Sequence, residues 1–67
     1  MSLFERNISG FTTTDGVSVY IDSKDIIAIE DHGKYRTIIC AFVEYEVLEV
    51  IEYCLQVFRQ NNNYLLS

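Results

Sequence analysis

The first part of the chain carries an alternating pattern that predicts a β-hairpin. Along residues 17–21, β-branched side chains fall at every second position, which is the period of a half-buried strand. Asp15-Gly16 lies between this run and residues 8–13, and an Asp-Gly pair is typical of a tight turn because glycine adopts positive φ at little cost. We therefore expect residues 8–13 and 17–21 to pair as antiparallel strands.

A second hairpin is predicted in the middle of the chain. The apolar run at residues 26–29 follows the polar segment 22–25 and is rich in isoleucine, which favours a strand. The run ends at residues 30–33, where His32-Gly33 is suited to a tight turn. The return strand is expected over residues 35–40.

The spacing of apolar residues changes after Phe42 and predicts an amphipathic helix that packs on the sheet. Apolar residues recur there at intervals of three and four, at Val43, Val47, Val50, Ile51, Cys54, Val57 and Phe58. An alternation over residues 43–47 leaves a second interpretation open, in which a short strand precedes a helix that begins at about Leu48. Residues 61–63 are expected to end the helix, and residues 64–66 to begin a further strand.

These elements together predict an α+β fold: a small, mostly antiparallel β-sheet of about four strands with one C-terminal amphipathic α-helix packed on it. The chain has 67 residues. A domain of this size buries only about 60% of the surface that its unfolded form exposes, so one core must supply most of its stability. Hydrophobic residues make up 49% of the sequence, which favours a folded domain over a disordered segment. We expect residues 1–67 to form a single domain.

The sequence offers no combination of residues from which a catalytic site could be assembled, so we expect a binding module and not an enzyme. His32 is the only histidine, and a zinc site would need further ligands. The three glycines are isolated from one another, so no phosphate-binding loop is predicted. We expect neither a metal ion nor a cofactor.

Two features predict a cytoplasmic location. Cys40 and Cys54 lie in apolar runs without C-x-x-C spacing and are interpreted as reduced, buried thiols. The first seven residues contain neither a long apolar run nor a small-residue cleavage pattern, so they do not resemble a secretory signal. We expect no contact with a membrane.

The charge of the chain is unusual for a protein that binds nucleic acid. Ten acidic and five basic residues give a net charge of −5, whereas free-standing nucleic-acid binders are usually basic. An acidic stretch is formed by Glu44, Glu46, Glu49 and Glu52. We interpret it either as a solvated helix face or as a surface that imitates the charge of DNA or docks a basic partner.

Two segments resemble the LytTR family of bacterial DNA-binding domains. The sequence DIIAIE at residues 25–30, followed by HGKYRTI at residues 32–38, is similar to the strand-turn-strand signature of the family. The sequence FRQNNNYLLS at residues 58–67 aligns without gaps with a second family motif, and an amphipathic helix lies between the two as in the family. The resemblance covers most of the chain from Ile8 to Ser67.

The resemblance implies a mostly β fold that inserts loops, and not a recognition helix, into successive grooves of duplex DNA. In the first loop, the basic residues would be phosphate anchors. In the second loop, asparagines could bond bidentately to adenine edges. The DNA-binding residues that the resemblance implies are Lys34, Tyr35 and Arg36 in the first loop and Asn61, Asn62 and Asn63 in the second.

The chain departs from the family in three respects. Residues 1–67 are expected to lack the C-terminal third of the family domain, with its further strands and a third DNA-contacting loop. Residues 40–42 contain no turn residue, so the hairpin turn that the family has between Ile39 and Val47 is expected to be lost or shortened. The basic residues allow about three phosphate contacts, which is too few for tight specific binding at cellular salt.

Two functions follow as hypotheses. The first is a LytTR-like module in bacterial transcription regulation that contacts duplex DNA directly or through a protein regulator. The second is an acidic protein-interaction module, or a phage-type inhibitor, whose open sheet edge pairs with a regulator or with a second copy in a homodimer. In the second hypothesis, the partner-binding residues are Tyr64, Leu65 and Leu66, as an exposed apolar strand edge. An isolated domain fragment without separate activity is a third interpretation.

Overall fold

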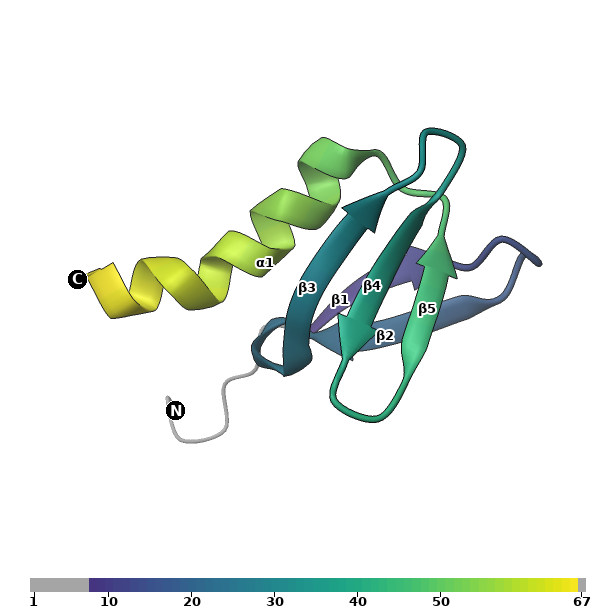
Figure 1. Ribbon diagram of the computed structural model, residues 1–67. Coiled ribbons are helices and arrows are strands. Elements are labelled where there is room, and N and C mark those ends of the chain that lie inside the picture. Colours follow the sequence, from purple (N-terminus) through teal and green to yellow (C-terminus); the bar gives the residue numbers. More distant parts are fainter. Residues whose placement is uncertain (1–7, 67) are drawn as a thin grey trace.

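The computed structural model describes the backbone of residues 8–66 and the side chains of residues 8–60 (Figure 1). This part of the chain forms five strands and one C-terminal helix. In chain order the elements are β1 (Ile8–Thr12), β2 (Ser18–Asp22), the short 3₁₀ helix η2 (Ser23–Asp25), β3 (Ile26–Asp31), β4 (Arg36–Cys40), β5 (Glu44–Val47) and α1 (Ile51–Leu66). The predicted α+β class is confirmed, with one more strand than expected and with the strands divided between two antiparallel sheets.

β1 and β2 form the predicted first hairpin. They pair antiparallel along their whole length. The Thr13 N–H donates to the Val17 carbonyl at 2.8 Å and closes the turn. Gly16 has a φ of 89°, which lies in the left-handed region that favours glycine. The turn therefore lies where the Asp15-Gly16 pair predicted it.

β3, β4 and β5 form a three-stranded antiparallel sheet with β4 in the middle. Gly33, with a φ of 88°, supplies the left-handed residue in the predicted turn between β3 and β4. A turn is present between β4 and β5, so the expectation that this turn would be lost is wrong. The Cys40 N–H donates to the Val43 carbonyl at 2.9 Å, which closes a tight turn around Ala41 and Phe42. Neither tip residue has positive φ, so this turn needs no glycine or asparagine.

Backbone hydrogen bonds connect the two sheets near the end of β1. Thr13 forms an isolated antiparallel bridge with Val47. The Leu48 N–H donates to the Thr12 carbonyl at 2.9 Å. The end of β1 therefore runs beside the end of β5 and fixes the first hairpin relative to the three-stranded sheet.

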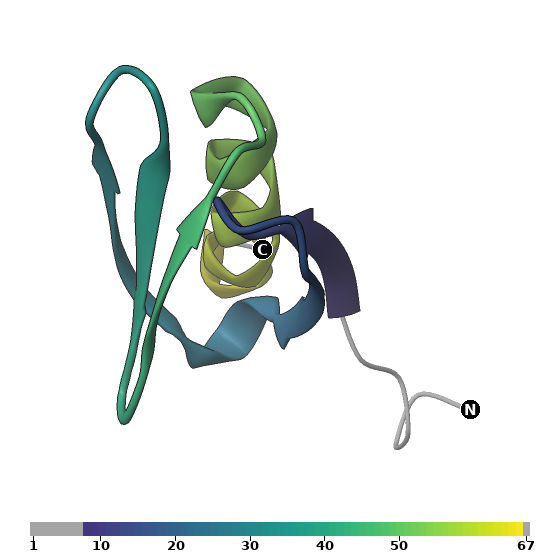
Figure 2. The same cartoon turned by 90° about the vertical axis from the view of Figure 1, so that its right-hand side faces the viewer.

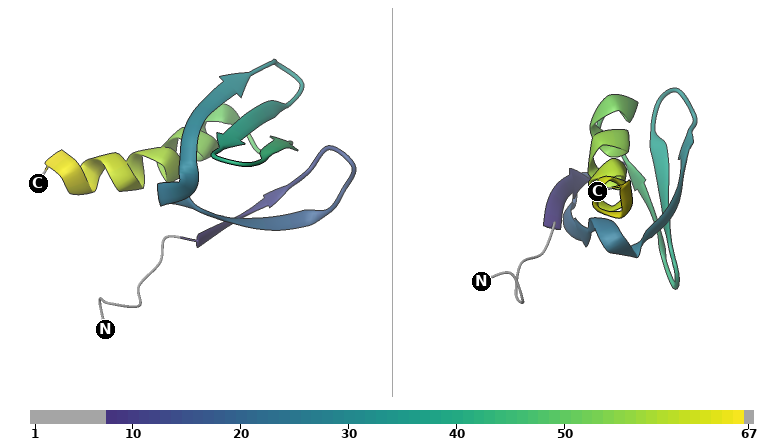
Figure 3. Two further views of the ribbon diagram at one scale, coloured as in Figure 1. Left: turned by 60° about the horizontal axis from the view of Figure 1, so that its bottom comes forward. Right: turned by 90° about the vertical axis from the view of Figure 1, so that its left-hand side faces the viewer.

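α1 lies across the side of the three-stranded sheet that faces β1 and β2 (Figure 2, Figure 3). The aromatic rings of Phe11 and Tyr53 join β1 to α1, with centroids 5.3 Å apart. No described element covers the opposite face of the three-stranded sheet (Figure 2). The buried hydrophobic core draws on both sheets and α1 and consists of Phe11, Ile21, Ile26, Ile38, Val47, Cys54 and Val57.

The helix differs from its prediction at both ends. β5 confirms the interpretation of a short strand before the helix, and α1 begins at Ile51 instead of Leu48. The backbone remains helical through residues 61–63 to Leu66, so the predicted strand at residues 64–66 is wrong. Asparagine is a weaker helix former than alanine by only about 0.7 kcal/mol, and the segment contains neither proline nor glycine. Nothing in its composition therefore enforces a helix end.

Candidate interaction surface

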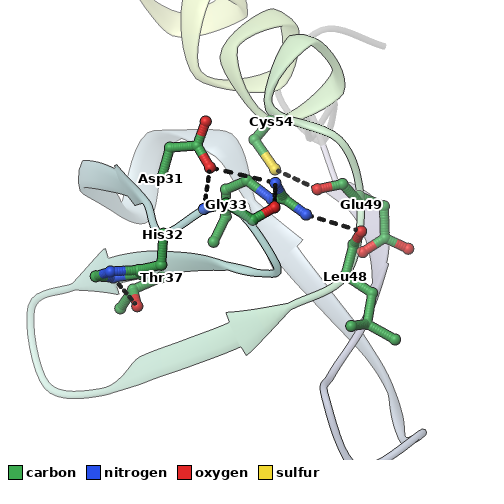
Figure 4. A network of polar contacts seen from close by, with 8 residues as sticks. Asp31, His32, Gly33, Thr37, Leu48, Glu49 and Cys54 are labelled. Atoms are coloured by element: carbon green, nitrogen blue, oxygen red, sulfur yellow. Dashed lines mark hydrogen bonds and ion pairs between the residues drawn. The ribbon is translucent and has the colours of Figure 1, made fainter.

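Arg36, which was expected to anchor a phosphate, is held inside the protein and is only 8% exposed. Its Nη1 donates to Asp31 Oδ1 and to the Gly33 carbonyl, and its Nη2 donates to the Leu48 carbonyl, each at 3.2 Å (Figure 4). The Gly33 N–H also donates to Asp31 Oδ1, and this bond and the guanidinium lower the pKa of Asp31. Arg36 thus joins the β3–β4 turn to the segment before α1. To reach a DNA phosphate, it would have to break these bonds.

The remainder of the β3–β4 turn is ordered by contacts of His32. The Tyr35 and His32 rings stack with centroids 4.7 Å apart and 26° between their planes. His32 Nε2 lies 3.1 Å from Thr37 Oγ1 and 3.3 Å from Glu30 Oε1. Lys34 is exposed beside this stack and makes no ion pair with another described residue. Among the three residues predicted for the first DNA-contacting loop, Lys34 is therefore the one whose charged group is exposed to solvent.

The second predicted DNA-contacting group, residues 61–63, lies on a helix and not in a loop. The predicted partner-binding residues 64–66 continue the same helix, so they do not form an open strand edge. The side chains of both groups lie outside the described residues. Figure 1 shows the C-terminal turns of α1 far from the β3–β4 turn. The structure therefore does not bring the two predicted DNA-contacting groups together.

The predicted acidic stretch is divided among different structural positions. Glu44 and Glu46 are exposed on β5, and they face away from α1 because alternate strand residues point to opposite sides. Glu49 is half-buried, and its two carboxylate oxygens accept the Thr12 N–H at 2.9 and 3.0 Å. Glu52 is exposed on the first turn of α1. The stretch is therefore not one helix face, and Glu49 has a structural contact of its own.

The sequence analysis did not predict a surface that lies between the start of β3 and the β4–β5 turn, at the bottom of Figure 1. Phe42 is fully exposed there, and the neighbouring side chains of Ile27 and Val43 are 61% and 45% exposed. They surround a groove of about 400 Å³. We call this surface the apolar end and define it by the residues that line the groove: Lys24, Asp25, Ile27, Cys40, Ala41, Phe42 and Val43.

Two local irregularities of the sheet create the apolar end. The β3–β4 register shifts between Ile26 and Ala28, so Ile27 is the extra residue of a β-bulge. A bulge redirects the side chain that it inserts. The tight turn after Cys40 then places Phe42 at its tip. Two features of the sequence could have indicated this surface: an apolar β3 run longer than one buried face requires, and an apolar segment at the turn.

Both cysteines are free thiols, as predicted. Cys54 is buried in the core as expected, but the expectation that Cys40 is buried is wrong, because Cys40 is only half-buried. Burial raises the pKa of both thiols, and the negative charge of Asp25 raises the pKa of Cys40 further. Each thiol is therefore protonated at neutral pH and is a poor nucleophile.

A second groove is polar and lies between the β1–β2 turn and β5. It has a volume of about 430 Å³ and is lined by Thr13, Thr14, Asp15, Glu44, Tyr45 and Glu46.

Within the part of the chain that the structure describes, no three or more histidine, cysteine, aspartate or glutamate side chains are grouped so that they could hold a metal ion. The described helix is also too short or too polar to cross a membrane.

Comparison with known proteins identifies no relative of this chain. No protein family matches it, and no match was found among curated proteins or among solved structures.

Proposed function

We propose that the protein is a non-enzymatic protein-interaction module that binds its partner through the apolar end. The observation that carries this proposal is the fully exposed ring of Phe42 beside an apolar groove. Burial of such a side chain is worth about 1.5–3 kcal/mol. Exposed apolar side chains that are contiguous, unlike single ones, are typical of contact sites, and aromatic residues often dominate the binding energy there.

The polar contacts support a binding role over a catalytic one. Arg36 and Glu49 use their charged groups to hold backbone segments together. His32 contacts Thr37 and Glu30 through the same nitrogen, so no described residue bonds its other ring nitrogen to orient it as a general base. The free thiols fit a reducing compartment, and we include a cytoplasmic location in the proposal.

The proposal is tested by incorporating a photoreactive phenylalanine analogue in place of Phe42 and irradiating cells that produce the whole chain. We expect a covalent adduct between position 42 and a protein. Tyr20 is the matched control, because it is 74% exposed on β2 but does not belong to the apolar end. Equal adducts from positions 20 and 42, or none from position 42, would contradict the proposal.

Duplex DNA is a second candidate partner, with a role in transcription regulation. It is favoured by the exposed Lys34 beside the Tyr35–His32 stack, in the turn where the resemblance to LytTR domains implies DNA contact. The test is an electrophoretic mobility shift at low salt. Lys34→Ala should abolish the shift, whereas Lys24→Ala, which removes the same charge elsewhere, should not. A wild-type chain that shifts no duplex removes this candidate.

A further inference from the structure

We infer that the partner at the apolar end is a second copy of this chain, bound in a two-fold symmetric dimer. This inference rests on the proposed function and names the partner. Its first support is that the apolar end contains both parts of a complementary contact. Phe42 is fully exposed and forms one wall of the groove, and the groove, at about 400 Å³, has room for an aromatic ring. A two-fold axis brings each Phe42 to the groove of the other copy, because both copies then use the same surface.

The charges at the groove are self-complementary. Lys24 and Asp25 are exposed neighbours on its rim, and neither makes an ion pair with another described residue. The two-fold axis that exchanges the Phe42 rings also lets Lys24 of each copy approach Asp25 of the other. A basic partner would instead meet Lys24 as a like charge. Opposite charges on one rim thus favour a second copy over a partner of one sign.

The opposite charges of Lys24 and Asp25 cancel at this groove, whereas the whole chain has a net charge of −5. Two copies repel each other wherever their acidic surfaces meet. Glu30 and Glu46 are exposed elsewhere on the sheet, and neither lines this groove. The apolar end combines exposed apolar side chains with two lining charges that cancel, so self-association there meets little charge repulsion.

The irregularity of β3 determines which kind of contact is expected. Within the described residues β3 pairs only with β4, which leaves its other edge without a strand. The bulge at Ile27 disrupts the regular ladder next to the groove. Bulges hinder the addition of a further strand at an edge. We therefore assign the contact to side chains of the apolar end and not to a continuous intermolecular sheet.

Sedimentation equilibrium of the whole chain tests the inference, because a dimer has twice the 7.8 kDa mass of the monomer. Wild type should show a concentration-dependent dimer, and Phe42→Asp should weaken it at least about 30-fold, as for loss of an aromatic hot spot. Tyr20→Asp introduces the same charge outside the apolar end and should leave dimerisation unchanged. Circular dichroism checks that both variants remain folded.

A charge exchange tests the symmetry. Lys24→Glu and Asp25→Lys should each weaken the dimer, and the double variant should restore it, because both variant charges then meet their opposites across the axis. A dimer that Phe42→Asp does not weaken, or a double variant no better than either single variant, would overturn the inference. So would a wild-type chain that is monomeric at about 1 mM. If that monomer still formed an adduct from position 42 with a different protein, the proposed function would stand and only the dimer would fail.

Discussion

Arg36 shows how the environment of one side chain decides its role. In the sequence it follows Lys34 and Tyr35, and the resemblance to LytTR domains implies an exposed, DNA-contacting position for it. In the structure its guanidinium donates to three acceptors from two segments of the chain. The strand period carries the relevant signal, because Arg36 is in phase with the core residue Ile38 on the same face of β4. The buried position could therefore have been predicted once the first residue of β4 was known.

We predict that Arg36→Ala destabilises the protein by about 2–4 kcal/mol, because it removes a buried cation and the donor to the Gly33 and Leu48 carbonyls. Arg36→Lys should restore only part of this loss, because an ammonium cannot reproduce the planar fork of the guanidinium. Urea denaturation measures the free energy of unfolding. Arg59→Ala is the matched control, since Arg59 is exposed on α1 and its loss should change stability by less than about 0.5 kcal/mol. Equal effects of the two alanine variants would show that the Arg36 contacts contribute nothing.

At the scale of elements, the sequence predicted what local patterns determine and missed what longer-range contacts determine. Both glycine turns and the four strands beside them follow from alternation and backbone preference. The segment 43–47 satisfied both a two-residue and a helical period, and pairing with β4 decided in favour of the strand. The apolar end was missed because no local pattern marks the bulge and the glycine-free turn that bring its two apolar segments together. The bridge between Thr13 and Val47 joins distant segments that no local pattern relates.

Glu49 provides a test of how the elements are held together. Its carboxylate is the acceptor for the Thr12 N–H and so links β1 to the segment before α1. We predict that Glu49→Ala destabilises the fold by about 1–3 kcal/mol, because a partly buried N–H loses its acceptor. Amide hydrogen exchange should become faster at Thr12 than at other protected amides. A general loss of stability would instead speed exchange at all of them. Glu52→Ala removes an exposed carboxylate from the next turn and should leave Thr12 protected. Protection at Thr12 in both variants would argue against this link.

At the scale of the whole molecule, the two candidate partners differ in their response to salt. Two copies with a net charge of −5 repel each other. At 0.1 M salt this repulsion is largely screened beyond about 10 Å. Contact between a lysine and DNA phosphates instead releases counterions, so salt weakens it. We predict that raising the salt concentration from about 20 to about 200 mM tightens the dimer a few-fold and weakens any duplex binding.

Sedimentation equilibrium at both salt concentrations measures the first effect, and the mobility shift measures the second. Phe42→Asp should remain largely monomeric at either concentration, because screening cannot replace the apolar contact that the ring supplies. A dimer that salt dissociates would be held mainly by ion pairs, with Lys24 and Asp25 as the first pair to examine. In that case the apolar contact would not be the main source of affinity. The direction of the salt response therefore separates association through Phe42 from association through charge.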